Sequence, residues 1–183
     1  MNVSKDPIVE ETERWILSFI VKLNICPFAK REVERDTVKI QVAQAKKISD
    51  ALEELLMALL YLDTNPTIET TLLVFPNLFK DFFKYLDFVD CAECLISEQG
   101  YEGIYQLASF HPDYCFANTC FDDVSNYTNR SPYPMIHILR EAGLEKAIAY
   151  YGDTEQIPTN NIVTMKKLGL EKIQALLRRI KAK

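Results

Sequence analysis

The stretch TTLLVFP, residues 70–76, decides the fold class of this chain. Its apolar residues follow one another without interruption, and the run is too short for an ordinary helix. Continuous apolar runs of this length are typical of strands that are covered on both faces. The segments on either side of it are therefore expected to supply helices that pack on a sheet.

Two other segments predict strands. TVKIQVAQ, residues 37–44, alternates apolar and polar residues, as half-buried strands do, and GIYQLASF, residues 103–110, predicts a third strand. Between the strands, apolar residues recur at helical spacing within residues 52–60 and 79–89. This order predicts an α/β protein with a small three-stranded sheet, parallel or mixed. An α+β two-layer sandwich is the alternative, because periodicity does not give strand direction.

Helical segments flank this core. An N-terminal helix is expected from Pro7, and Pro27 stops it. Residues 131–142 follow a long loop and predict another helix, with Ser131 as its N-cap. The C-terminal region is helical by its pattern, with breaks near Pro158 and Gly169.

Length and composition indicate one soluble domain over residues 1–183. The chain is 48% hydrophobic and 26% charged, and no apolar run approaches the ~20 residues of a membrane span. Without an export signal, five cysteines favour reduced thiols in the cytoplasm. The net charge is −5, and the basic residues after Asn160 have no interleaved aromatics, so nucleic-acid binding is not expected.

His111, one of two histidines, stands where the third predicted strand enters a long loop. If the second and third strands are parallel, their carboxyl ends share the edge where α/β sheets bind ligands, and the loop would cover it. An imidazole there is a candidate general base or metal ligand. The alternative is that His111 bonds to its own turn ahead of Pro112.

A candidate anion site lies at the start of the helix expected after the loop. A helix N-terminus favours anions, and Arg130, with help from Asn129 and Ser131, would clamp a carboxylate or phosphate. On that helix His137, Arg140 and Glu141 share a face, and a histidine–glutamate pair four residues apart can support a catalytic or metal site. Alternatively this face is only solvated, and Arg130 ties down the loop.

Cys26 lies at the end of the first predicted helix. The helix dipole there disfavours a thiolate, so the thiol is a nucleophile, a metal ligand or a buried hydrophobe. Cys91 and Cys94 form a C-x-x-C within an aromatic-rich helix and are expected in the core. Cys115 and Cys120 lie in the loop and give only a weak metal signal with His111.

Four motifs carry a resemblance to a known family: NICPFA, QLASFHPDY, NYTNRSPYPMIHILREA and IPTNNIVTMKKLG. Together they resemble a bacterial family catalogued as domain of unknown function 1415, over nearly the whole chain. The resemblance implies membership and no mechanism. It draws attention to the motif positions, which are Cys26, Pro27, His111, Asn129, Arg130, Ser131, His137 and Arg140. Cys115 and Cys120 look like departures from the family's usual residues.

Three functions fit these observations. The first is a cytoplasmic enzyme for a small anionic metabolite, with His111 as base, Cys26 as nucleophile and Arg130 as anion clamp. The second is a metal-binding protein that uses Cys26, His111 and His137. The third is a non-catalytic binding or adaptor module that uses the loop and the basic tail. The sequence assigns no cofactor, reaction class or oligomeric state.

Overall fold

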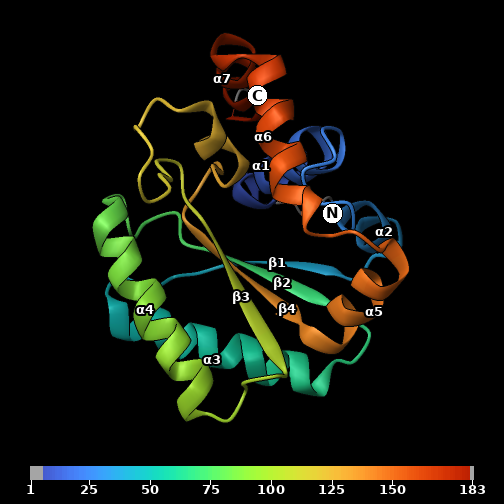
Figure 1. Ribbon diagram of the computed structural model, residues 1–183. Coiled ribbons are helices and arrows are strands. Elements are labelled where there is room, and N and C mark those ends of the chain that lie inside the picture. The colour runs from blue at the N-terminus through green and yellow to red at the C-terminus, as the bar shows by residue number, and fades with distance from the viewer. Residues whose placement is uncertain (1–5, 182–183) are drawn as a thin grey trace, which may run out of the picture.

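A single mixed sheet forms the centre of the fold. The computed structural model describes residues 6–181. The strands are β1 (Val38–Val42), β2 (Thr70–Val74), β3 (Tyr105–Phe110) and β4 (Met135–Arg140). Their order is β1-β2-β4-β3 (Figure 1). β1 and β2 are parallel, whereas β4 is antiparallel to both β2 and β3, so β1, β2 and β3 share one direction. The α/β class is confirmed, but the sheet has a fourth strand that the sequence did not predict.

That fourth strand, β4, replaces the helix predicted for residues 131–142, which was wrong. Ile136 and Ile138 are buried against one layer of helices, while Met135 and His137 face the other. β-Branched residues favour this extended conformation. Because helices cover both faces, apolar residues occupy both faces of β4, and the strand alternation is hidden. Ser131 is accordingly no helix cap, and its hydroxyl donates to the carbonyl of Tyr133 at 2.6 Å.

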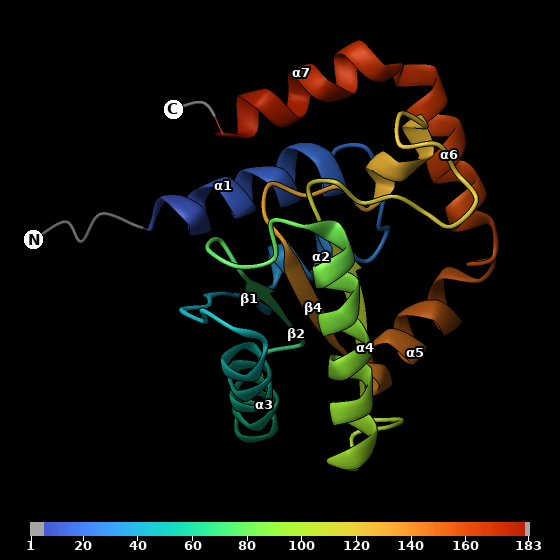
Figure 2. The ribbon, with the colours of Figure 1, turned by 90° about the vertical axis from the view of Figure 1, so that its left-hand side faces the viewer.

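Helices surround the sheet. They are α1 (Pro7–Trp15), the π-helix η1 (Ile16–Val21), α2 (Ala29–Glu34), α3 (Ile48–Thr64), α4 (Phe82–Glu98), the 3-10 helix η2 (Val124–Thr128), α5 (Glu141–Tyr151), α6 (Gln156–Leu168) and α7 (Leu170–Lys181). Helices cover both faces of the sheet, so the two-layer alternative is wrong (Figures 1 and 2). Among residues 6–181, no helix has both the length and the apolar character that crossing a bilayer requires.

One face of the sheet packs against α3 and α4. Leu55, Leu59 and Leu62 of α3 and Phe88 of α4 are fully buried there. The strands and Phe75, the residue after β2, contribute the other side chains on this side; the strand residues are Leu73, Tyr105, Leu107, Ile136 and Ile138. These residues form one continuous apolar core, as most of the predicted leucine and phenylalanine stripes require, but Leu60 and Phe83 of those stripes are exposed.

The other face packs against α1, η1 and the C-terminal helices. Trp15, Ile16, Phe19 and Ile20 are buried on this side, as the N-terminal helical pattern predicted. α7 lies beside α1, which places both ends of the described chain in one layer (Figure 2). Gly169, with a φ of 76°, separates α6 from α7 as predicted. The break predicted near Pro158 is confirmed, because α5 ends at Tyr151, α6 begins at Gln156, and Pro158 lies in the first turn of α6.

Candidate functional site

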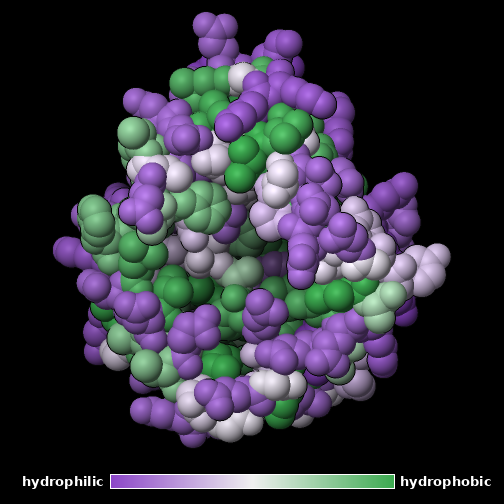
Figure 3. Space-filling model, in the orientation of Figure 1, coloured by the Kyte–Doolittle hydropathy of each residue, from purple (hydrophilic) through white to green (hydrophobic). Residues whose placement is uncertain are grey.

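A cavity of about 1060 Å³ lies between the sheet and the helices of the second face. Its walls come from η1, α2, α5, α6, the loop after β3 and the strands. Figure 3 shows the hollow on this face of the molecule, with apolar side chains inside it and hydrophilic ones along its rim. The apolar lining includes Trp15, Ile16, Ile20, Val33, Leu72 and Leu139.

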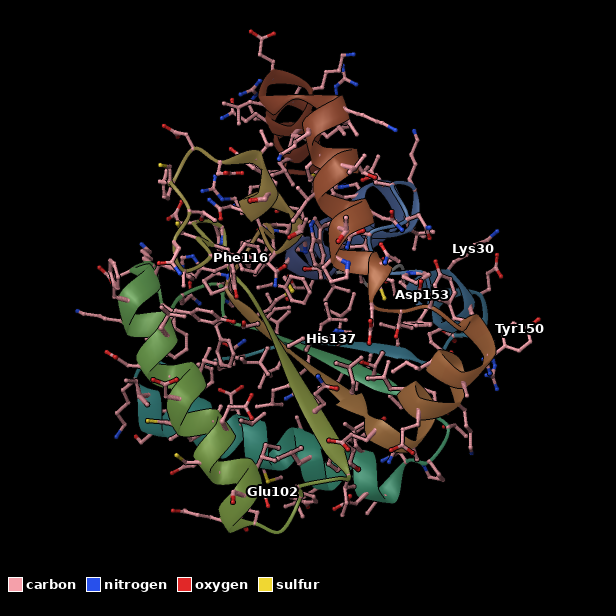
Figure 4. All side chains as sticks on the ribbon, viewed as in Figure 1. Lys30, Glu102, Phe116, His137, Tyr150 and Asp153 are labelled. Atoms are coloured by element: carbon pink, nitrogen blue, oxygen red, sulfur yellow. The ribbon has the colours of Figure 1, made fainter. Side chains whose placement is uncertain are left out.

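His137 is the central polar residue of this cavity. It points from the middle of β4 into the hollow, whose rim includes Phe116 of the loop (Figure 4). Its Nε2 contacts the hydroxyl of Thr70 on β2. The Thr70 hydroxyl also lies 2.7 Å from the carbonyl oxygen of Ile138, an acceptor to which it must donate its single hydrogen. Nε2 of His137 is therefore the donor in the contact with Thr70.

This tautomer leaves Nδ1 of His137 as an unprotonated acceptor. Burial lowers the pKa of His137 to about 4, so the ring is neutral at neutral pH. Within residues 6–181, Nδ1 has no hydrogen-bond partner, and it is not fully buried. It therefore keeps an accessible lone pair, and the accessible space at this residue is the cavity.

Trp15 adds an unpaired donor next to the same space. Its ring is 1% exposed, lines the cavity and meets the ring of Phe110 edge-on, with centroids 5.3 Å apart. Its indole Nε1 is buried without a hydrogen-bond partner among the described residues. Trp15 directly precedes the π-helix η1, and π-helical turns are frequent at functional sites.

Cys26 lines the cavity, but its surroundings do not activate the thiol. Burial raises its pKa, and backbone hydrogen bonds from Phe28 and Ala29 only partly offset this effect. The thiol therefore stays protonated at neutral pH, as its position after the first helix also suggested. A neutral imidazole with the pKa of His137 is too weak a base to deprotonate it.

His111 lies elsewhere, buried between α4 and the loop. Nε2 donates to the carbonyl of Phe79 at 2.8 Å, and Nδ1 accepts from the backbone N–H of Asp113 at 2.9 Å. Its ring packs against Phe82 and Tyr85, and burial lowers its pKa. Both ring nitrogens are thus occupied, and the second contact is the bond to its own turn that the sequence offered as the alternative. His111 does not line the cavity.

Arg130 is also held by main-chain contacts. Its Nε donates to the carbonyl of Tyr114 at 3.1 Å, and a terminal nitrogen donates to that of Phe121 at 2.7 Å. The guanidinium lies between the rings of Phe121 and Tyr127. No helix begins beside it, so the anion clamp lacks the helix terminus on which it was predicted. Arg130 ties down the loop, as the alternative interpretation required.

The other predicted site residues, Asn129, Arg140 and Glu141, do not form one cluster. Asn129 lines the cavity, although its side-chain amide donates to the carbonyl of Ser109. Arg140 donates to the carbonyls of Ile68, Leu62 and Asn65 and to the hydroxyl of Tyr105. Glu141 begins α5, so the predicted face that it shared with His137 on one helix does not exist.

The remaining cysteines do not form a metal site. Over residues 6–181, no group of three or more His, Cys, Asp or Glu side chains could hold a metal ion. Cys91 and Cys94 are exposed on α4, so the prediction that they belong to the core is wrong. Cys115 is half-buried and Cys120 is exposed.

A second hollow, of about 670 Å³, lies where α3 and α4 begin. Lys47, Lys80 and Lys84 border it, and so does Asp81, whose carboxylate caps α4. It lies beyond the carboxyl ends of β1 and β2, the edge at which the sequence predicted a ligand. The predicted anionic ligand stays a prediction at this edge.

A family model described as "Protein of unknown function (DUF1415)" matches residues 7–175. The chain belongs to this family. The resemblance carried by the four sequence motifs is thereby confirmed, and the match contains every residue of both hollows. Neither the curated proteins nor the solved structures gave a match to the chain.

In this DUF1415 protein, the sequence predicted four residues that line the cavity, but not the cavity itself; they are Cys26, Asn129, His137 and Arg140. The sequence did not point to three further lining residues, which are Trp15, Thr70 and Glu69, the residue just before β2. A usable signal was present in IHI, residues 136–138, where a histidine stands between two β-branched residues of a buried segment. A polar side chain in such a place needs a partner, and Thr70 is that partner.

Proposed function

We propose that this protein binds a small, largely apolar molecule in the cavity between the sheet and η1, and that the ligand donates a hydrogen bond to Nδ1 of His137. The volume of about 1060 Å³ is at the upper end of the range for small-molecule sites. An apolar lining with a few placed polar groups is the usual composition of such sites.

The accessible lone pair of His137 carries this proposal. Nδ1 has no hydrogen-bond partner within residues 6–181 and borders the cavity, so a ligand donor that enters the cavity can pair with it, at a net gain of about 0.5–1.5 kcal/mol. Thr70 fixes the ring so that the unpaired nitrogen is an acceptor. A hydroxyl or N–H group of a ligand would donate the hydrogen bond that Nδ1 lacks.

Binding fits the ionisation of the site better than catalysis does. His137 is neutral and weakly basic, and Cys26 is protonated, so neither group is poised for proton transfer or nucleophilic attack. The catalytic roles of His111 and Cys26 stay predictions, and in His111 both nitrogens would have to leave their partners first.

The test uses N-phenyl-1-naphthylamine, a neutral apolar fluorophore with one N–H donor. Trp15 is the only tryptophan and lines the cavity, so energy transfer from it to the bound dye reports occupancy of this site. We expect saturable one-to-one binding. The His137→Leu variant is expected to bind about tenfold more weakly, because it loses one buried hydrogen bond.

Blocking the cavity gives the sharper arm of the experiment. Ala108 lies directly opposite His137 in the sheet and lines the cavity, so Ala108→Phe is expected to fill the space over the imidazole and abolish transfer. Ala149→Phe on the exposed side of α5 is the matched control. Equal dye binding by both variants, with unchanged circular dichroism, would show that the dye binds elsewhere and would overturn the proposal.

A further inference from the structure

Glu69 places a carboxylate in the wall of the same cavity. It immediately precedes β2, and its carboxylate lies against the first turn of α5. A Cβ atom at Gly143 would come within 2.5 Å of Oε2 of Glu69. The absence of a side chain at Gly143 is therefore what admits the carboxylate to this position.

The Glu69 carboxylate has no partner in the described part of the chain. No hydrogen bond or ion pair of its side chain occurs there. The first turn of α5 offers partial positive charge, because its N–H groups and the helix dipole point toward this end. This partial charge favours a carboxylate beside the turn, and because the oxygens make no hydrogen bond within the described residues, they are available to a donor from the cavity.

The cations of the cavity wall do not neutralise this group. The guanidinium of Arg140 is committed to three backbone carbonyls and to Tyr105. Arg31 pairs with Glu32 at 3.5 Å, and Arg35 and Lys146 are exposed at the rim. Apart from the buried indole N–H of Trp15, the unpaired polar atoms described in this wall are therefore acceptors, namely Nδ1 of His137 and the oxygens of Glu69.

We infer that the cavity selects an amphipathic amine, whose protonated nitrogen pairs with Glu69 and whose apolar body runs along the sheet past His137. The inference rests on the proposed function of the cavity. The register places Glu69 opposite Arg140, three residues from His137 along β4. Three residues of a strand span roughly 10 Å, so an amine at Glu69 needs an apolar body of about that length to reach His137.

The experiment compares three probes of equal length, decylamine, 1-decanol and decanoate, by their displacement of N-phenyl-1-naphthylamine. We expect decylamine to bind about tenfold more tightly than decanol, because a charge-assisted hydrogen bond in a partly buried site is stronger than a neutral one. Decanoate is expected to bind most weakly, because the acceptors repel it.

Two variants assign the preference to Glu69. Glu69→Gln keeps the shape of the side chain and removes its charge. We expect decylamine and decanol to bind this variant with equal affinity. Gly143→Ala keeps the charge of Glu69 but forces its carboxylate to move. We expect it to weaken the binding of decylamine and to leave the binding of the other two probes unchanged. Glu98→Gln, at the exposed end of α4 and away from the cavity, is the matched control and should leave all three affinities unchanged.

The outcomes separate this inference from the function on which it rests. Equal binding of the three probes, or tightest binding of decanoate, would overturn the amine preference and leave the cavity as a binding site. A preference for decylamine that survives in Glu69→Gln would equally overturn the assignment. Failure of all three probes to displace a dye that does bind would overturn the inference alone, whereas absence of dye binding removes the proposed function as well.

Discussion

The two faces of the sheet are built from similar residues but packed in different ways. On the face toward α3 and α4, buried side chains fill the space between the layers. On the face toward α1, η1 and α5, a similar set of apolar residues surrounds a cavity of about 1060 Å³. Close packing stabilises the folded state, whereas side chains that border an empty space forgo part of that stabilisation. The first face therefore contributes the denser packing, and the second contains the cavity in which we propose that a ligand binds.

The polar groups differ in the same sense. On the packed face, the hydroxyl of Tyr85 donates to the carbonyl of Met135 and accepts from the N–H of Phe110. The hydroxyl of Thr71 is unpaired there, but it is small and fully enclosed. On the cavity face, the unpaired groups of His137 and Glu69 border an open space, where a ligand can reach them.

The largest expected effect tests the difference in packing. Leu73 and Leu139 lie on adjacent strands but on opposite faces, the first fully buried and the second lining the cavity. Leu73→Ala should lower the free energy of unfolding by about 2–5 kcal/mol, because it creates a new void. Leu139→Ala should cost less than about 2 kcal/mol, because its side chain already borders empty space. Urea unfolding measures both, and equal losses would contradict the comparison.

The next effect is a pH dependence that belongs to the cavity face. The pKa of His137 is lowered from an ordinary value of 6.5 to about 4, so the folded state resists a proton that the unfolded chain accepts. Stability conferred by the neutral ring is present above pH 6.5 and is lost as the pH falls through about 4. The full difference is up to about 3 kcal/mol.

The variant His137→Leu isolates this contribution. The free energy of unfolding of the natural protein should fall more steeply between pH 6.5 and 4 than that of the variant. Burial also lowers the pKa of His111, so part of the slope should remain in the variant. Identical slopes in the two proteins would show that His137 is not held neutral by burial.

The smallest effect compares the two histidines at pH 7. His111→Leu removes the hydrogen-bond donor to the carbonyl of Phe79. The backbone of Phe79 has a φ of 61°, which is strained for a bulky residue. We expect a loss of about 1–3 kcal/mol in the free energy of unfolding. His137→Leu should change it by less than about 1 kcal/mol, because the hydroxyl of Thr70 keeps its bond to Ile138. A larger loss in His137→Leu than in His111→Leu would reverse the roles assigned here.

The sequence predicted the elements that have a clear local pattern. The leucine stripe of α3 buries one face of that helix, residues 37–44 alternate apolar and polar side chains, and β2 is a short, uninterrupted apolar run that is buried on both faces. β4 was missed because its apolar run is interrupted by His137 and lies between a proline-rich loop and a helix. His137 then matched a helical spacing with Glu141 by coincidence.

The site was only partly predictable for a related reason. Apolar residues around a cavity, such as Ile16 and Leu72, have the same pattern as residues in a filled core, and only their three-dimensional separation reveals the space. His111 drew attention because of its position after a strand. Its role is to bond to the carbonyl of Phe79, a residue with a positive φ, and no local sequence pattern predicts that conformation.

The position of β4 within the sheet has a consequence for synthesis on the ribosome. Among the strands of residues 6–181, β4 is the last to be made, yet it lies between β2 and β3 and joins them. A nascent chain that has emerged only as far as residue 134 therefore has β3 without any partner along its length. Contacts of such sequence separation form slowly, and exposed strand edges invite aggregation in the meantime. The sheet of this protein is completed only when residues 135–140 leave the exit tunnel.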